Sequence, residues 1–255
     1  MKILFVKWLA SMIFSLAFVT YTYAYENRIR VGDALPRATL VKEGIHHYLT
    51  YIKDGDRYTP IDIMSRQIKF NQEKGKDEMI VLQRWDGIGD FAYTKQIESG
   101  FRSRNFEPTY HIRRTIRDKK ETIEEYTFEP GVVIGLHTST DHTKTTINVP
   151  TEEPTFNFET DVEMLQSLAF GLNYEVRINF YHPGGPSRPA TYLFRVVSEE
   201  RIPWVGGEID CWVVSTDYNM PNKVAMFWFE KKSQLLVRKA EKISNGRWFV
   251  RAMID

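Results

Sequence analysis

The chain has 255 residues, of which 42% are hydrophobic and 26% charged, a composition that fits a globular protein and excludes a low-complexity chain. Its formal net charge of +1 excludes the basic excess that a general binder of nucleic acid or of anionic membranes needs. Aromatic residues make up 14% of the chain and suit pleated, half-buried surfaces, which favours β structure.

The first 24 residues have the pattern of a secretory signal peptide. Lys2 and Lys7 supply the positive end, an apolar run spans residues 8–21, and small-residue positions at Thr22 and Ala24 predict cleavage after Ala24. The alternative is an uncleaved membrane anchor, for which a 14-residue run is short. We therefore expect residues 25–255 to form a single β-rich domain without a transmembrane segment, exported to the periplasm or the cell envelope.

Alternation of apolar and polar residues with period two dominates the first half of the mature chain and predicts antiparallel strands. Turn-forming stretches rich in Gly, Asp and Asn separate these strands. The predicted strands cover residues 46–53, 61–70, 78–85, 91–99, 109–117, 121–128, 131–137 and 144–149.

The stretch "GLHTSTDHTKTT" at residues 135–146 raises the question of a metal site, because His137, Asp141 and His142 lie close together. A five-residue step between the histidines matches neither strand-borne nor helical ligand spacing. The stretch also lies between two predicted strands and is rich in residues that form turns. We interpret it as a hairpin tip with both histidines in solvent, and we predict no metal.

One segment, residues 159–170, predicts a helix. Thr160 and Glu163 have the spacing of a capping box, and Gly171 is expected to end the helix. The predicted apolar stripe consists of Val162, Leu165, Leu168 and Ala169.

The strands predicted after this helix alternate more cleanly. Tyr174, Val176, Ile178 and Phe180 share one face of a strand. The runs "CWVV" and "VAMFWF" are apolar on both faces, which indicates that both sides are covered, one of them by the helix. We expect one antiparallel sheet with a helix packed on it.

Motifs for catalysis are absent from the sequence. It contains no G-x-S-x-G, and one cysteine excludes C-x-x-C and an internal disulfide. Cys211 lies in a strand-like run and is predicted to be a buried, inert thiol. Asp86 and Asp90 could form a glycosidase pair, but their glycine-rich surroundings favour a turn. We predict no enzyme, no catalytic residue and no cofactor, although a hydrolase site built from distant residues stays an alternative.

The remaining candidate site is a set of aromatic residues spread over consecutive strands, which could line an apolar pocket for a greasy ligand. The alternative is that they form an ordinary core. The predicted ligand-binding residues are Tyr174, Phe180, Tyr192, Phe194, Trp212 and Trp228.

The second half also carries a longer pattern. "DVEMLQSLAFG" is followed by "YEVRINFYHPG", by "YLFRVVSEERIPWVGGEIDCWVVSTDY" and by "FWFEKKSQLLVRKAEKISNGRWFVRAM". This pattern resembles the exported bacterial proteins grouped as domain of unknown function 3108, and the resemblance extends from about Ile45 to Ile254. It implies a fold similar to the half-barrel of the periplasmic lipoprotein carriers, which is a strongly curved antiparallel sheet with one or two covering helices. The family assigns no catalytic residues.

Together, the signal, the aromatic strands and the resemblance predict a non-catalytic envelope protein. We expect it to bind a lipid, a lipidated protein or another hydrophobic ligand on the concave face of the sheet. The alternative, from a different class, is a structural or adaptor protein that binds another envelope protein through a sheet edge or an exposed patch.

Overall fold

The computed structural model describes residues 27–71, 77–185 and 187–255, so the predicted signal peptide lies outside the described residues. Most of the described chain is β-strand. The strands are β1 (Arg28–Ile29), β2 (Gly44–Asp54), β3 (Arg57–Asn71), β4 (Glu78–Gly87), β5 (Tyr93–Arg102), β6 (Pro108–Arg117), β7 (Lys120–Glu129), β8 (Val132–Thr138), β9 (Lys144–Pro150), β10 (Phe156–Asn157), β11 (Glu175–Tyr181), β12 (Ala190–Trp204), β13 (Gly207–Thr216), β14 (Ala225–Glu230), β15 (Leu236–Lys242) and β16 (Trp248–Met253). One α-helix, α1 (Asp161–Gln166), and four 3₁₀ turns, η1 (Ala38–Leu40), η3 (Gly89–Phe91), η4 (Phe158–Thr160) and η5 (Ser244–Gly246), complete the described elements.

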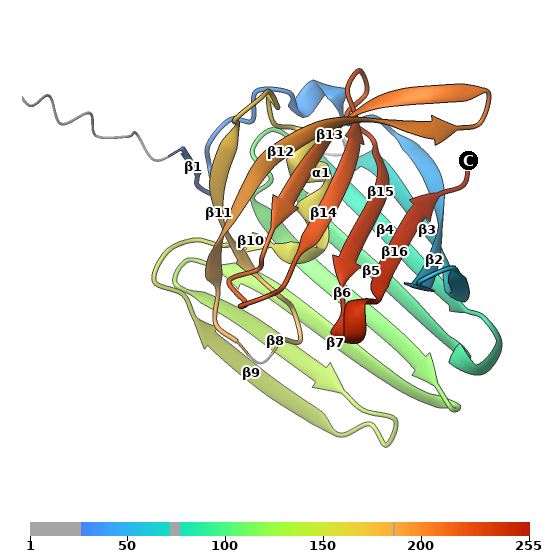
Figure 1. Ribbon diagram of the computed structural model, residues 1–255. Helices are drawn as coiled ribbons and strands as arrows, with labels where there is room; N and C mark the ends of the chain where they lie inside the picture. Colours follow the sequence, from blue (N-terminus) through green and yellow to red (C-terminus); the bar gives the residue numbers. More distant parts are fainter. Residues whose placement is uncertain (1–26, 72–76, 186) are drawn as a thin grey trace, which may run out of the picture.

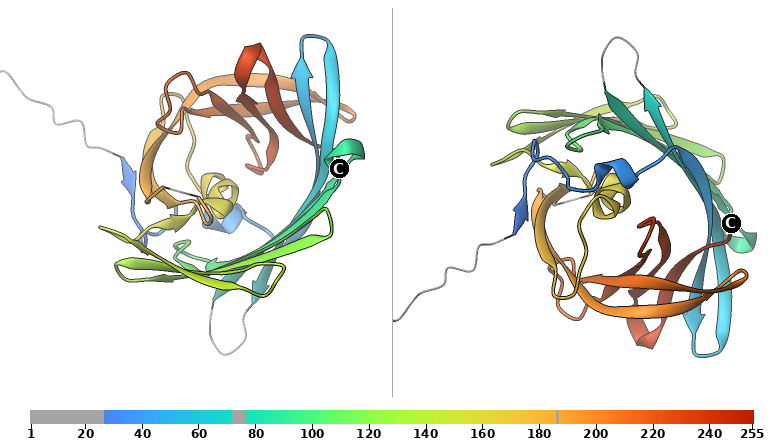
Figure 2. Two further views of the ribbon diagram at one scale, coloured as in Figure 1. Left: turned by 90° about the horizontal axis from the view of Figure 1, so that it is seen from below. Right: turned by 90° about the horizontal axis from the view of Figure 1, so that it is seen from above.

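All the described strands belong to one 16-stranded sheet that curls around α1 (Figures 1 and 2). The order along the sheet is β1-β11-β12-β13-β14-β15-β16-β2-β3-β4-β5-β6-β7-β8-β9, with β10 also pairing with β11. Antiparallel pairing of β16 with β2 places the last strand of the chain beside the second one. The sheet stays open between β9 and the β1, β10 and β11 edge. The predicted curved antiparallel sheet with a helix on it is therefore confirmed.

The inner face of the sheet holds the main apolar core, which surrounds α1. Val162, Met164, Leu165 and Leu168 of the helical region are at most 5% exposed and pack in this core. Inward residues of β3 to β5 and of β11 to β14 meet them from the walls. Because the pleat sends alternate residues inward, the predicted face made by Val176, Ile178 and Phe180 is confirmed as core-facing.

Strands β13 and β14 are apolar on both faces, as predicted, because a second apolar cluster lies on the outer face. It contains Cys211, Val213 and Trp228, and it includes Val237 and Val250 of the neighbouring strands β15 and β16. The inner cluster takes the intervening residues, such as Phe227 and Phe229. Only the inner face is covered by α1, so the outer cluster is closed by the side chains of the sheet itself.

The helix is shorter than predicted, and the predicted capping box is wrong. The side chain of Asn157, rather than that of Thr160, caps the region, since it accepts from the backbone N–H of Glu159 at the start of η4. The Thr160 hydroxyl donates instead to the carbonyl of Asn157, and the Glu163 carboxylate binds Arg66. The helix ends at Gln166 and not at the predicted Gly171. In the described part of the chain, no helix combines the length and apolarity needed to cross a bilayer.

Candidate functional site

The predicted ligand-binding aromatic residues divide between the two faces of the sheet. Five lie on the inner face, where Phe180, Phe194 and Tyr192 are at most 8% exposed and Tyr174 and Trp212 pack against the same core. Phe158 of η4 stands edge-on to Phe180 and Tyr192, with ring centroids 5.4 and 6.1 Å away. The side chains of η4 and α1 therefore pack against these five aromatic residues on the concave face.

Trp228 is the exception, since it lies on the outer face with the second apolar cluster. It contributes to a groove of about 340 Å³, which we call the outer groove. The groove is mostly apolar and is lined by Tyr51, Tyr58, Met226, Trp228, Trp248 and Val250, together with Lys53 and Arg238. Tyr58 is 59% exposed, so much of its ring is open to a ligand in the groove.

Two cations flank the aromatic rings of the outer groove. The Arg238 guanidinium lies 3.9 Å from the Trp228 ring centroid, and the Lys53 ammonium lies 5.8 Å from that of Tyr58. The Trp228 indole donates to Glu200 at 2.7 Å, which fixes the ring in the groove floor. The groove can therefore offer apolar contact along its length and positive charge at its sides.

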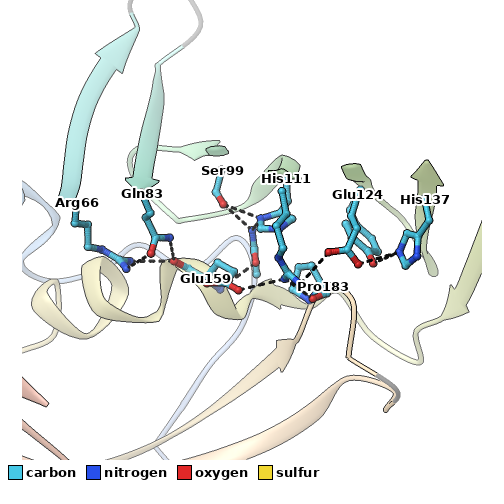
Figure 3. Close-up of polar contacts among 11 residues, drawn as sticks. Arg66, Gln83, Ser99, His111, Glu124, His137, Glu159 and Pro183 are labelled. Carbon is cyan, nitrogen blue, oxygen red and sulfur yellow. Dashed lines mark hydrogen bonds and ion pairs between the residues drawn. The ribbon is translucent and has the colours of Figure 1, made fainter. Parts of the chain in front are cut away.

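A polar network ties the start of the helix to the opposite wall (Figure 3). The Arg66 Nε donates to Glu163 at 2.6 Å, and its Nη1 donates to Gln83 at 2.7 Å. Arg66 Nη2 and Gln83 Nε2 both donate to the carbonyl of Glu159. Charge attraction and hydrogen bonding from Glu163 raise the pKa of Arg66 against the opposing effect of burial, so the guanidinium stays charged. This ion pair anchors α1 to β3.

The network continues from Glu159 through Arg113 toward the open side of the sheet. Arg113 Nη2 lies 3.3 Å from Glu159 and donates to the carbonyl of Pro183 at 2.6 Å, while Nη1 donates to Glu124 at 3.1 Å. Burial raises the pKa of Glu159, but the charges of Arg113, Lys95 and Arg66 outweigh it and hold the pKa below its ordinary value. Glu159 is therefore an ionised carboxylate held among cations.

Ser99 and His111 form the pair that most resembles catalytic machinery. The Ser99 hydroxyl and His111 Nδ1 are 2.9 Å apart, and the Asn157 amide lies 3.3 Å from the hydroxyl. Both residues are 0% exposed, so no substrate reaches them in this conformation. Burial lowers the pKa of His111 to about 4, which keeps the ring neutral. These contacts connect β10 to β5 and β6 and give no support to a hydrolase site.

The stretch at residues 135–146 does form a hairpin tip, between β8 and β9. His142 is exposed there with a φ of 64°, and Asp141 accepts from the backbone N–H of Thr143. The prediction that His137 lies in solvent is wrong. It is half-buried because its Nε2 is 2.6 Å from the Tyr126 hydroxyl and 3.3 Å from Glu124. The two histidines therefore belong to different environments.

Two further predictions concern Cys211 and the acidic pair. Cys211 is fully buried, as predicted, and burial raises the pKa of its thiol to about 11, which disfavours the reactive thiolate. Asp86 is bound by Arg84 at 2.7 Å on the surface, and a hydrogen bond from that guanidinium lowers the pKa of Asp86. Asp90 belongs to the η3 turn, in agreement with the turn interpretation.

Comparisons with known proteins agree with this fold. A family model described as a protein of unknown function (DUF3108) matches residues 48–255. The chain is also similar to a crystal structure of a β-barrel-like protein of domain of unknown function DUF1849 from Brucella abortus. The identity is 11%, the TM-score is 0.54, and the match covers 83% of this chain and 97% of that chain. No curated protein matches the chain.

Proposed function

The chain belongs to the DUF3108 family of proteins of unknown function, and we propose that it is an exported, non-catalytic protein of the cell envelope that binds a hydrophobic ligand. The ligand is the acyl chain of a lipid or of a lipidated protein, held in the outer groove. The observation that carries this proposal is the groove itself, since Tyr51, Tyr58, Trp228 and Trp248 line one continuous surface of the sheet.

The size and chemistry of the outer groove favour an amphiphile. Its volume of about 340 Å³ falls within the range of small-molecule sites, and its lining combines apolar walls with a small number of polar groups. Arg238 and Lys53 supply positive charge beside the rings, which complements an anionic head group. Arg238 Nη2 lies 3.6 Å from Glu200, which offsets part of this charge, whereas Lys53 forms no ion pair with another described residue.

The inner face offers less room for an acyl chain. Phe180, Phe194 and Leu165 are each at most 1% exposed, because α1 and η4 fill the space between the walls. A ligand at the five inward aromatic residues would have to displace the helix, whose Glu163 is held by Arg66. Of the two faces, the outer one requires no rearrangement.

Displacement of a fluorescent fatty acid tests the proposal. Dansyl-labelled undecanoic acid should bind the purified wild-type protein saturably and be displaced by oleate. Tyr58→Ala or Trp248→Ala should weaken binding about fivefold, because each removes a ring worth about 1 kcal/mol of apolar contact. Phe91→Ala is the matched control, since Phe91 is 42% exposed outside the groove. Equal affinity in all four proteins would refute the groove as the site.

An adaptor role is the second candidate, and the open edge of the sheet favours it. In the described part of the chain, β9 (Lys144–Pro150) pairs only with β8, so its other edge can accept a strand from an envelope protein. Cross-linking in envelope fractions separates the two roles. A partner lost with Ile147→Pro in β9, but kept with Tyr58→Ala, would favour the adaptor.

A further inference from the structure

A group of polar residues lies on the inner face of the sheet, away from the outer groove and independent of the function proposed above. Four inward residues sit side by side on neighbouring strands, with Lys239 paired to Arg251, Arg251 to Thr50, and Thr50 to Asp62. We call these four residues the inner polar row. They belong to β15, β16, β2 and β3, which form one wall of the curled sheet in Figure 2.

Three consecutive members of this row carry polar atoms without a partner among the described residues. These atoms are Arg251 Nε, Thr50 Oγ1 and Asp62 Oδ1. Thr50 is 0% exposed and Asp62 is 2% exposed. The Tyr93 hydroxyl donates to Oδ2 of Asp62 at 2.6 Å, so only the second carboxylate oxygen, Oδ1, has no hydrogen-bond partner among the described residues. Buried polar groups are normally hydrogen-bonded, so three adjacent exceptions indicate a ligand position.

The positive charges of Lys95 and Arg251 act on each other at the row, and the carboxylates of Glu159 and Asp62 only partly offset the charge of Lys95. The Lys95 ammonium lies 3.7 Å from the Trp85 ring centroid, and the Arg251 guanidinium lies 6.0 Å from it. Neither forms an ion pair or hydrogen bond with another described residue. Burial, followed by the charges of Arg113 and Arg251, lowers the pKa of Lys95 against the opposing effect of Glu159. Lys239, in contrast, is neutralised by Glu241 at 2.8 Å.

We propose that the inner polar row, together with Lys95, binds a phosphate group, either free or as a phosphomonoester. Arg251 and Lys95 supply the charge, and the Thr50 hydroxyl donates to or accepts from the anion. Asp62 Oδ1 accepts a hydrogen bond from a protonated phosphate oxygen. Because a carboxylate repels an anion that has no proton to donate, the site discriminates against sulfate.

Solvent reaches the side chains beside the buried atoms of the row. Lys95, Tyr93 and Arg251 are all partly exposed even though they face the inside of the curled sheet. α1 packs against the apolar residues of β11 to β14 and contacts this wall through Arg66. A phosphate can therefore approach from the side of Lys95 and Arg251, whose side chains must move to uncover the buried oxygens of Thr50 and Asp62, while the helix stays in place.

Titration of the full mature protein with inorganic phosphate tests the inference, with the Trp85 indole N–H signal as the readout. The signal is assigned by its loss in Trp85→Phe. In mildly acidic buffer, where the phosphate monoanion still carries a proton, the Trp85 signal should shift saturably with phosphate and tenfold more weakly with sulfate. Glycerol 1-phosphate is the second arm. Tighter binding of this ester than of phosphate identifies a phosphomonoester as the ligand, and the reverse identifies free phosphate.

Variants assign the effect to the row. Arg251→Gln should weaken phosphate binding at least tenfold, whereas Arg104→Gln, at a guanidinium side chain that is 89% exposed, should leave it unchanged. Asp62→Asn should abolish the preference for phosphate over sulfate. No saturable shift with either phosphate or the ester, or equal affinity in wild type and Arg251→Gln, would overturn the proposal.

Discussion

The inner face of the sheet has two walls of different character. The wall formed by β11 to β14 presents Phe180, Phe194 and Phe227 to α1 and is closed by close packing. The wall formed by β15, β16, β2 and β3 presents Lys239, Arg251, Thr50 and Asp62, three of which hold unpartnered buried atoms. The first is a core and the second has the chemistry of a site. On the inner face, therefore, packed aromatic residues mark the core, and polar atoms without partners mark the candidate site.

The largest expected effect comes from the ion pair that joins α1 to β3. Arg66→Met leaves the Glu163 carboxylate, which is 1% exposed, without its guanidinium, and we expect the free energy of unfolding to fall by about 3–5 kcal/mol. Urea denaturation measures the loss. Arg104→Met is the matched control, because its ion pair with Asp77 is exposed and should contribute less than about 1 kcal/mol. Similar losses in both variants would mean that the helix is not anchored there.

The next largest effect is expected from the apolar packing of α1 against the walls of the sheet. Leu165 is 0% exposed in the core around α1, so Leu165→Ala should lower the free energy of unfolding by about 2–5 kcal/mol. Ile116→Ala, at an isoleucine that is 37% exposed, should cost less than about 1 kcal/mol. Thermal denaturation followed by circular dichroism compares the two. A loss at Leu165 as small as that at Ile116 would show that the helix does not fill the inner face.

Asp161 of α1 connects the two walls and should give stability a pH dependence. Burial raises the pKa of Asp161 to about 6 against the effect of Lys239. The folded state therefore binds more protons than the unfolded state between about pH 4 and 6, and this group makes stability fall as pH rises through that window. Relative to the wild type, the free energy of unfolding of Asp161→Asn should therefore increase by on the order of 2 kcal/mol from pH 4 to pH 7.

The measurement for Asp161 is the difference between the two unfolding free energies at each pH. His111 acts in the opposite direction, since its lowered pKa of about 4 makes stability rise with pH. It is present in both proteins, so its effect cancels in the difference. A difference that does not change with pH would place Asp161 in solvent.

The smallest expected effect comes from comparing a buried hydroxyl of η4 that has a partner with one in the inner polar row that has none. Thr160 is 2% exposed and its hydroxyl donates to the carbonyl of Asn157 at 2.8 Å, so Thr160→Val should cost about 1 kcal/mol. Thr50 is 0% exposed with an unpartnered hydroxyl, so Thr50→Val should cost nothing or stabilise slightly. Equal losses on urea denaturation would contradict the distinction between the hydrogen-bonded hydroxyl of Thr160 and the unpartnered hydroxyl of Thr50.

Strands and faces follow from period-two alternation, because the pleat converts sequence parity directly into orientation. This is why the predicted strands match β2 to β9, and why Trp212 and Val214, two residues apart, both face inward. The same parity, applied to Phe227, Trp228 and Phe229, separates Trp228 from its two neighbours and could have identified the outer groove.

Other features depend on pairings that no local pattern contains. Arg66 meets Glu163 across 97 residues of sequence, and this contact removes Glu163 from the predicted capping box. The inner polar row needs the pairing of β16 with β2 and the register shift between Thr50 and Tyr51, which determine which residues face inward. The position of His137 likewise depends on Tyr126 and Glu124 of the neighbouring strand.

Native mass spectrometry of the protein purified from envelope fractions tests the proposed binding of a hydrophobic ligand most directly. The proposal predicts a lipid-sized mass adduct on the wild-type protein that is retained in Phe91→Ala and lost in Tyr58→Ala and Trp248→Ala. A wild-type protein without any adduct, or an adduct that persists unchanged in the groove variants, would contradict it.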